Sequence, residues 1–341
     1  MGRLRSKSRK GTGLSKITRW VGLAIGGVTA ALGAGAAIQS IASARDKRRY
    51  PAPGRLVDVG GYRLHIACLG RGQPPVVMDA GIGSLALEWG ILPPEIARFT
   101  TVCTYDRAGY GWSDPARGRR SLPQAVEDLR HLLHAAGVEG PYLLVGHSLG
   151  GLHAQYYARR YPEQVAGLVL LDAPPPDFYT RLPRRFARRW DLQRRQRWLA
   201  ARFGLTRLGL LTERPPIGLP PEAQRLASRL NLPPSYWRAY IGEAAYLNKD
   251  MAAMLAEAGP LPAIPLAVIT PHAALWAQAL FPGAAETWLE GQRALAQLSP
   301  RGRLLFTQAT GPHFFQEETE LIVRTVREMV EEIRHSSQEV S

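Results

Sequence analysis

A serine between glycines is the strongest chemical signal in this sequence. Gly146-His147-Ser148-Leu149-Gly150 directly follows the apolar run Tyr142–Val145 and opens a helical pattern over Leu149–Arg160. Gly-x-Ser-x-Gly at such a junction is typical of a sharp, strained turn, in which only small neighbours tolerate the crowding around the serine. The turn exposes the hydroxyl and points the helix N-terminus at charge that develops beside it. The pattern therefore predicts that Ser148 is a nucleophile.

A serine hydroxyl needs a base within hydrogen-bond reach and a group that orients this base. His313 is the candidate base, because it follows the last predicted strand in Gly311-Pro312-His313. His147 lies in the turn itself, and we expect its side chain to be structural. The three histidines on predicted helices, His131, His134 and His153, are expected to be solvated or packed. Two further histidines, His65 and His335, have no evident partner.

The segments that would position these groups alternate between strands and helices. A Gly60-Gly61 pair predicts a hairpin turn between the first two strands, and Ser121-x-x-Gln124 predicts a helix start. Further helices are predicted around Leu85–Phe99 and over Glu320–Ile333. Short apolar strands between helices indicate a mostly parallel sheet that is covered on both faces. The predicted strands are Leu56–Val59, Tyr62–Cys68, Val76–Met78, Thr101–Tyr105, Tyr142–Val145, Leu168–Leu171, Leu266–Ile269 and Arg303–Phe306.

Three motifs give the chain a resemblance to the α/β-hydrolase fold superfamily, specifically to its serine-nucleophile esterase and lipase-like branch. They are Gly-His-Ser-Leu-Gly-Gly at 146–151, Asp-Arg-Ala-Gly-Tyr-Gly-Trp-Ser at 106–113 and Gly-Pro-His at 311–313. The resemblance covers residues 54–334 apart from an insertion. It implies an α/β fold with a mostly parallel central sheet, helices on both faces and a helical cap. The 106–113 loop is expected to be structural.

The family order of serine, acid and histidine implies a triad of Ser148, an acid and His313. Many relatives carry the acid after the strand that here is Leu266–Ile269, but no carboxylate follows that strand before Glu286. Haloalkane-dehalogenase-like members carry it at the end of the preceding strand, where this chain has Asp172. We therefore expect Asp172 to orient His313 and keep Glu286 as the alternative.

An oxyanion hole needs two backbone N–H groups that are fixed before charge develops. Leu149, the residue after the nucleophile, is expected to supply one of them. The other is expected from Ile82, in the Ala80-Gly81-Ile82-Gly83 loop where relatives often have His-Gly-x. A plain glycine turn is the alternative interpretation of this loop.

The net charge of +15 is concentrated in two segments. Residues 1–44 hold seven Lys/Arg and no acid, and residues 173–260 hold fifteen basic and seven acidic residues. The rest of the chain is balanced. No nucleic-acid recognition motif accompanies the charge, so nucleic-acid binding is not expected. No cofactor is implied, and no Cys/His cluster has metal-ligand spacing. Cys68 and Cys103 are expected to be two buried thiols.

An uncharged run near the N-terminus predicts a membrane anchor. Trp20–Ile38 would span about 28 Å as a helix, which is near the hydrocarbon thickness of a bilayer. The excess of positive charge before it favours a basic cytoplasmic tail at 1–19 and a transmembrane helix or uncleaved signal anchor at 20–44. The catalytic domain would then be extracytoplasmic. A signal peptide cleaved near Ala42-Ser43-Ala44 is the alternative.

The predicted organisation divides the remainder into a hydrolase core at 45–172 and 261–341 and an arginine-rich helical cap at 173–260. The cap is expected either to be a solvated lid whose aromatic residues close the pocket or to lie on anionic lipid. The predicted reaction is hydrolysis of a carboxylic ester, small or lipid-like, through an acyl-enzyme. A serine nucleophile argues against haloalkane or epoxide hydrolysis. A ligand sensor with slow turnover, an acyltransferase and a membrane-tethered scaffold with a dead site are the alternatives.

Overall fold

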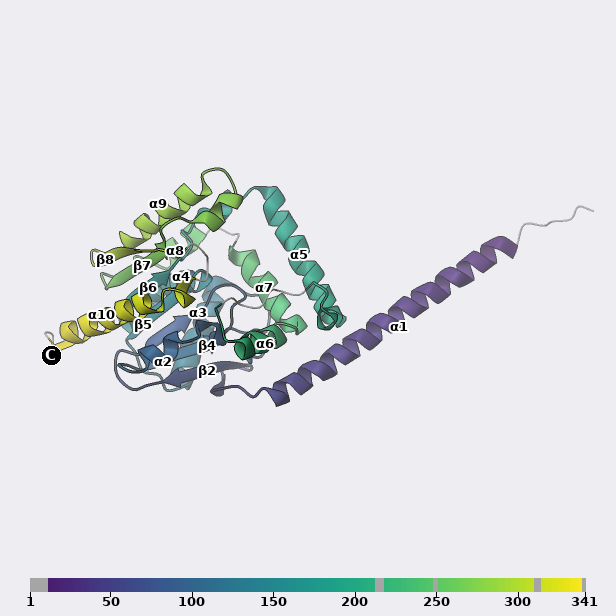
Figure 1. Cartoon of the computed structure of the whole chain (residues 1–341), viewed down its shortest axis with the longest axis horizontal. Helices are drawn as coiled ribbons and strands as arrows, with labels where there is room; N and C mark the ends of the chain where they lie inside the picture. Colours follow the sequence, from purple (N-terminus) through teal and green to yellow (C-terminus); the bar gives the residue numbers. More distant parts are fainter. Residues whose placement is uncertain (1–11, 212–217, 248–250, 310–313, 339–341) are drawn as a thin grey trace, which may run out of the picture.

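The computed structural model describes residues 12–211, 218–247, 251–309 and 314–338, and Figure 1 shows their arrangement. Within these residues eight strands form one sheet in the order β1-β2-β4-β3-β5-β6-β7-β8. The first two strands run antiparallel, β2 also pairs antiparallel with β4, and all later neighbours are parallel. The predicted α/β class with a mostly parallel sheet is confirmed.

The strands lie close to their predicted positions. Asp58 Oδ1 accepts the backbone N–H groups of Gly60 and Gly61, both glycines have positive φ, and the predicted hairpin turn is confirmed. The inner strands are buried on both faces, which explains their continuous apolar runs. The strands are β1 Arg55–Asp58, β2 Arg63–Leu69, β3 Val76–Asp79, β4 Val102–Asp106, β5 Tyr142–His147, β6 Val165–Leu171, β7 Leu266–Pro271 and β8 Gly302–Thr307.

Helices cover both faces of the sheet. On one face α2 and α10 pack over a core from the inner strands, and on the other α3, α4, α8 and α9 contribute buried side chains. The helices are α1 Thr12–Arg49, α2 Leu92–Ile96, α3 Leu122–Ala135, α4 Leu149–Arg160, α5 Arg184–Arg202, α6 Pro221–Leu230, α7 Pro234–Leu247, α8 Met251–Glu257, α9 Ala284–Ala296 and α10 Thr319–Gln338. Short 3-10 turns are η1 Ala86–Trp89, η2 Pro162–Gln164, η3 Phe178–Arg181, η4 Leu205–Leu208, η5 Leu275–Ala279 and η6 Phe314–Gln316.

The single helix predicted around Leu85–Phe99 is wrong. The structure has η1 and then α2, separated at Gly90, whose φ is +57°. A glycine in this conformation ends a helical segment, and the Pro93-Pro94 pair fits only the first turn of the next one.

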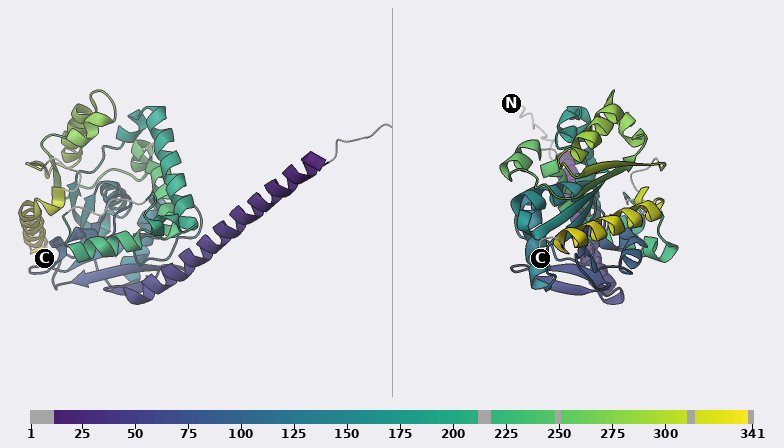
Figure 2. Two further views of the ribbon diagram at one scale, coloured as in Figure 1. Left: turned by 45° about the vertical axis from the view of Figure 1, so that its right-hand side comes forward. Right: turned by 90° about the vertical axis from the view of Figure 1, so that its left-hand side faces the viewer.

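The helices α5, α6 and α7 form a separate layer beside the carboxyl ends of the inner strands (Figure 2). Their shared core includes Ala201, Leu230 and Trp237, and it continues into Tyr110 and Trp112 of the body. This layer falls within the predicted cap.

The long helix α1 extends away from the body (Figure 1). The segment from Thr18 to Arg49 is long and apolar enough to cross a membrane, and none of its most apolar stretch is buried. Its described contacts with the body lie in its C-terminal half, from Gly35 onward. Arg207 of the cap donates to Gln39 Oε1 at 2.7 Å and pairs with Asp46 at 2.8 Å. One N-terminal helix of this kind is suited to be a membrane anchor.

Cys68 and Cys103 form a disulfide between β2 and β4. The two residues are directly opposite each other in the antiparallel register of these strands. The expectation of two unpaired thiols is therefore wrong, because the strand register brings together two cysteines that are 35 residues apart.

Candidate active site

Ser148 is the one residue between the end of β5 and the start of α4. Its φ of 49° and ψ of −119° lie in a region that L-residues rarely adopt. The Ser148 N–H donates to Leu171 O on the neighbouring strand at 3.0 Å, and Gly151 N–H donates to Ser148 O at 2.9 Å. These bonds hold the strained turn, and Ser148 remains half-buried between buried neighbours.

The glycines of the motif are required by close backbone packing. A Cβ at Gly146 would overlap Gly150 and Gly151, and a Cβ at Gly150 would overlap the carbonyl oxygen of Asp79. Any side chain at these positions would push α4 away from the end of β5. The serine can therefore sit in its bend only because the residues two positions before and after it are glycine.

Asp172 occupies the matching position on the next strand. In the parallel register His147 of β5 pairs with Leu171 of β6, so Ser148 and Asp172 each follow the last paired residue. Asp172 also has a positive φ, 46°, and besides Ser148 and Asp172 only Leu211 shares this property among the described non-glycine residues. The predicted nucleophile and the predicted acid thus leave adjacent strands through similarly strained turns.

Two donors hold the Asp172 carboxylate in a buried position. Thr270 Oγ1 and Trp288 Nε1 both donate to Asp172 Oδ1, each at 2.7 Å. Burial raises the pKa of Asp172 to about 6, although both hydrogen bonds oppose this increase. The group is therefore ionised at neutral pH but protonates under mildly acidic conditions.

The alternative acid, Glu286, lies on the first turn of α9 and is exposed. It lacks the buried position at the end of a central strand that Asp172 has. The predicted base, His313, lies outside the described residues. The nearest described segment after it is η6, where the Phe315 ring packs on the ring of His147 with centroids 4.7 Å apart. His147 is buried between Phe315 and Trp89, which fits a structural side chain.

The loop that carries Ile82 lies directly against the serine. An ideal Cβ on Gly81 would be 3.3 Å from the Cβ of Ser148 and 3.0 Å from Nδ1 of His147. Leu149 is the first residue of α4, so its N–H has no acceptor within the helix. Both predicted oxyanion donors therefore belong to segments that meet at Ser148.

A buried arginine holds this loop. Arg107 Nη1 donates to Ala80 O at 2.6 Å, and Arg107 Nη2 donates to Gly81 O at 2.7 Å. The Gly81 carbonyl and the Ile82 N–H belong to one planar trans peptide unit and point in opposite directions. Fixing this carbonyl on Arg107 thus also fixes the direction of the Ile82 N–H. Sequence reasoning assigned no role to Arg107 beyond its structural loop.

Arg107 is part of a buried charge network that joins the sheet to the cap. Its Nη1 pairs with Asp79 of β3 at 2.6 Å, and its Nε pairs with Glu243 of α7 at 2.8 Å. Arg120 also pairs with Glu243, at 3.1 Å, and His153 Nδ1 is 2.7 Å from Asp79 Oδ2. Burial alone would raise the pKa of Asp79, but His153 and Arg107 outweigh it and lower this pKa to about 2. Arg107 and Arg120 likewise lower the pKa of Glu243.

The 106–113 loop has the structural role expected for it. The Asp106 carboxylate accepts the N–H groups of Ala86 and Trp112, and Ser113 Oγ donates to Asp106 O. His65 Nδ1 lies 2.8 Å from Asp106 Oδ2 in the same buried cluster. The expectation that His65 has no partner is wrong, because β2 pairs antiparallel with β4 and places His65 opposite Asp106.

A cavity of about 500 Å³ begins at Ile82 and extends under the cap. Its wall combines aromatic side chains from η3, α5, α7 and η5 with two arginines of α5. This volume is within the range of small-molecule sites. The lining residues are Ile82, Tyr179, Trp190, Gln193, Arg194, Arg197, Tyr240, Ala244, Leu247, Trp276 and Leu280.

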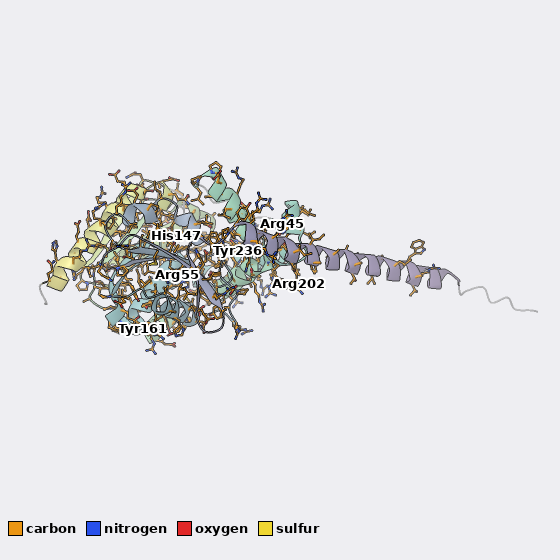
Figure 3. The ribbon with its side chains drawn as sticks, turned by 90° about the horizontal axis from the view of Figure 1, so that it is seen from below. Arg45, Arg55, His147, Tyr161, Arg202 and Tyr236 are labelled. Carbon is orange, nitrogen blue, oxygen red and sulfur yellow. A yellow bond between two sulfur atoms is a disulfide. The ribbon has the colours of Figure 1, made fainter. Side chains whose placement is uncertain are left out.

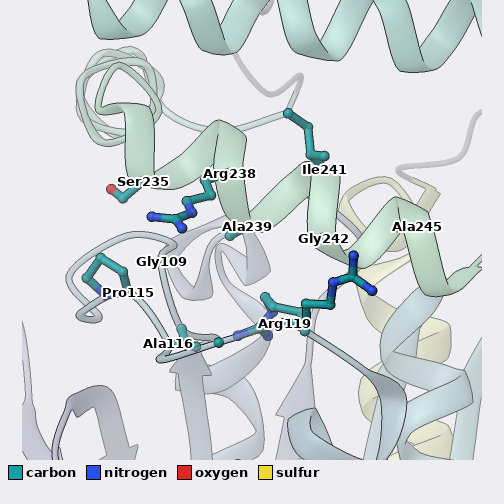
Figure 4. A pocket seen from close by; sticks show the side chains of 13 residues that line it. Gly109, Pro115, Ala116, Arg119, Ser235, Arg238, Ala239, Ile241, Gly242 and Ala245 are labelled. Atoms are coloured by element: carbon teal, nitrogen blue, oxygen red, sulfur yellow. The ribbon is translucent and has the colours of Figure 1, made fainter.

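A second cavity, of about 420 Å³, lies between the loop after β4 and α7 (Figure 4). Small residues such as Gly109 and Ala239 line it together with Arg119 and Arg238. None of its lining residues is a predicted member of the triad or of the oxyanion hole. Of these two cavities, the cavity at Ile82 is therefore the one that adjoins the candidate site residues.

Comparison with known proteins agrees with this geometry. The sequence model of a family described as alpha/beta hydrolase fold matches residues 74–249. The uncharacterized protein YbdG of Bacillus subtilis is 30% identical over 128 residues, which are 37% of this chain and 39% of YbdG. The chain spans about two fifths or less of the length of the first curated relatives it matches.

Two solved structures share the fold. The enol-lactonase from Burkholderia xenovorans LB400 is 18% identical, with a TM-score of 0.60 over 81% of this chain and 99% of its own. The Cif epoxide hydrolase from Acinetobacter nosocomialis is 16% identical, with a TM-score of 0.65 over 86% of this chain and 96% of its own. At these identities the likeness concerns the fold alone, and the reaction must be argued from the site.

Proposed function

The chain belongs to the alpha/beta hydrolase family, and from this premise we propose that it is a serine hydrolase that cleaves carboxylic esters through an acyl-enzyme. The observation that carries the proposal is the pairing of Ser148 and Asp172. A strained serine and a buried, hydrogen-bonded carboxylate leave adjacent parallel strands at matching positions. This juxtaposition supplies the nucleophile and the orienting acid of a triad.

In the proposed reaction, Ser148 Oγ attacks the ester carbonyl carbon while His313 accepts the hydroxyl proton. The N–H groups of Ile82 and Leu149 stabilise the negative charge on the carbonyl oxygen. When the C–O bond breaks, His313 gives its proton to the leaving alcohol. Water then attacks the acyl-enzyme in the same way and releases the carboxylic acid, which restores the serine.

The described neighbours of His313 support its role as base. Phe315, two residues further along the chain, packs on His147, which directly precedes Ser148. The described segment that directly follows His313 in the chain thus lies beside the residue before the nucleophile. Asp172 is proposed to hold the imidazole in one tautomer and to stabilise its charged form.

The cavity at Ile82 supports a small or medium-sized substrate. Its aromatic wall suits an apolar acyl or alcohol group, and Arg194 is buried against the rings of Trp190 and Tyr240. A serine at the strand end, rather than an aspartate, favours ester hydrolysis over epoxide opening, although epoxide hydrolases share the fold.

We further propose that the protein is a single-pass membrane protein with its hydrolase body on the extracytoplasmic side. Seven basic residues and no acid precede the apolar run, which favours a cytoplasmic N-terminus. The Cys68–Cys103 disulfide is consistent with an oxidising compartment.

The experiment that tests the proposed reaction is a panel of p-nitrophenyl esters of increasing chain length, assayed with the full chain. Wild type should hydrolyse at least one ester at many turnovers per minute, and Ser148→Ala should reduce this rate to the background. Asp172→Asn should lower kcat by about 10⁴-fold, whereas Glu286→Gln should leave it unchanged.

Three other results of these assays would support a different nucleophile or a different function. An active Ser148→Ala variant would place the nucleophile elsewhere. Turnover far below one per minute on every ester, with tight binding of the product acid, would support the sensor alternative. Transfer to an added alcohol in preference to water would support an acyltransferase.

A further inference from the structure

One face of the cap helix α5 combines arginine with leucine. Six exposed side chains, spaced alternately three and four residues apart, lie in a row along this helix. We call this row the α5 stripe. The opposite side of α5 contributes Trp190, Gln193 and Arg194 to the cavity at Ile82. The α5 stripe consists of Arg185, Arg188, Leu192, Arg195, Leu199 and Arg202.

The turn after α5 continues this exposed apolar surface. Leu208 is 75% exposed, and Leu210 and Leu211 are each 52% exposed. Three exposed leucines within four residues are unusual on a protein surface that faces only water. The helix itself holds eight arginines and one aspartate, so the surface is strongly cationic as well as partly apolar.

The position of α1 relates this surface to a membrane. Figures 1 and 2 show that α5 lies on the side of the body from which α1 departs and runs across the direction of α1. In Figure 3, Arg45 of α1 and Arg202 of α5 both lie at the junction of α1 with the body. A bilayer crossed by α1 would therefore face the α5 stripe.

The length of α1 indicates that the cap would reach the surface of a bilayer that α1 crosses. A hydrocarbon core of about 30 Å needs roughly 20 helical residues, which from Trp20 reach to Gln39. The cap already touches α1 at Gly35, where an added Cβ would overlap the carbonyl oxygen of Phe203. Four residue steps separate Gly35 from Gln39, so the cap overlaps the span by about 6 Å. Interfacial helices insert to a similar depth.

We propose that the α5 stripe and the turn residues Leu208, Leu210 and Leu211 form a docking surface for an anionic lipid bilayer. The leucines enter the interface, and the arginines extend to the lipid phosphates. The proposal depends on membrane insertion of α1 and is independent of ester hydrolysis. It would place α5 between the bilayer and the cavity at Ile82.

The test measures lipid contact directly in the full chain. Both native cysteines are in the disulfide, so a bimane fluorophore can be attached specifically to Leu208→Cys. The protein is reconstituted in nanodiscs of phosphatidylcholine and phosphatidylglycerol, with doxyl-labelled lipid as the quencher. Leu275→Cys is the matched control, because Leu275 is 48% exposed but lies in η5, which packs on α9.

Quenching at position 208 should exceed that at position 275 by about threefold or more, since only the former would reach the acyl boundary. Equal, weak quenching at both positions would overturn the proposal. Shielding of position 208 from an aqueous quencher without quenching by lipid would also overturn it, in favour of a second protein copy on this surface. Failure of the full chain to enter nanodiscs would remove its basis.

The charge component has its own comparison. Replacing Arg185, Arg188 and Arg195 by glutamine should lower the ratio of docked to undocked molecules by about 100-fold, if each contributes the usual attraction to an anionic surface. Arg71, Arg293 and Arg324 are exposed and lie outside the cap, so their replacement by glutamine gives the same charge change elsewhere. An equal loss of quenching in both triple variants would show attraction by net charge alone and would contradict the proposed surface.

Discussion

The titration of the Asp172 carboxylate is set mainly by its burial. This carboxylate is almost completely buried, and burial raises its pKa from 3.8 to about 6. A raised folded-state pKa means that this group favours the folded protein below about pH 3.8, and this contribution is lost as the pH rises through 6. At neutral pH the ionised form is destabilising by about 3 kcal/mol, because one pKa unit corresponds to 1.36 kcal/mol. A cost of this size at a strand end is reasonable for a functional group.

Thr270 should tune this titration. Thr270→Val removes one donor to Asp172 Oδ1, which disfavours the carboxylate and raises the pKa further. If the ionised form orients the base, the acidic limb of the kcat/KM profile should move to higher pH by about one unit. Thr325→Val is the control, because Thr325 is equally buried but donates to Leu321 O on α10. An unmoved acidic limb in Thr270→Val would remove Asp172 from the catalytic titration.

At this scale five consecutive residues were enough to predict the strained turn at Ser148, which the structure confirms. The role of Asp172 was predicted only through a resemblance, since a single aspartate after an apolar strand is not distinctive. The positive φ that Asp172 shares with Ser148 could not be predicted, because it depends on the hydrogen bond from Asp172 N–H to Ile269 O on the neighbouring strand. Arg107 and Glu243 were missed for the same reason, since their contact joins residues 136 positions apart.

At the scale of elements, the junction of β5 and α4 depends on the absence of side chains. Gly150→Ala should destabilise the fold by about 3 kcal/mol or more and abolish activity, because the new methyl group would overlap the backbone of Asp79. Gly27→Ala is the matched control, since a Cβ there meets nothing within 4 Å. Thermal unfolding of the two variants gives the comparison. A Gly150→Ala protein with wild-type stability would mean that α4 is less tightly packed against the end of β3 than described.

Strand positions were predictable because apolar runs bounded by turn residues depend on local sequence. The break at Gly90 and the pairing of Cys68 with Cys103 were not. The helical periodicity over 85–99 continues through the glycine, and only the packing of η1 and α2 on the body shows that the chain turns there. The disulfide follows from the register of β2 and β4, which a single sequence does not reveal.

For the molecule as a whole, the buried charge network connects the cap to the loop that carries Ile82. Arg107→Lys should lower kcat by about 10- to 100-fold with little change in KM, because lysine keeps the charge but lacks the fork that holds two carbonyls and two carboxylates together. Arg55→Lys is a suitable control, since Arg55 holds only the Ala136 carbonyl at the surface. Steady-state measurement of kcat and KM on one ester, with both variants and wild type, tests this expectation. A rise in KM alone would show that the network shapes substrate binding instead.

The arrangement of α1 and α5 also relates the proposed membrane position of the protein to its candidate active site. The cap helix α5 lines the cavity at Ile82, and Arg207 ties the proposed anchor α1 to the cap through Gln39 and Asp46. An ester that partitions into the bilayer would therefore be concentrated beside the cavity. The sequence predicted an anchor and a cationic cap as separate features, but only the folded chain shows that they face the same side.

Covalent labelling shows directly whether Ser148 is an activated nucleophile. The full chain is treated with a fluorophosphonate, and the modified residue is located by mass spectrometry of its peptides. We expect one adduct, on Ser148, that is absent from Ser148→Ala and formed much more slowly in Asp172→Asn. An unmodified folded protein, or an adduct on a different residue that persists in Ser148→Ala, would show that Ser148 is not the nucleophile.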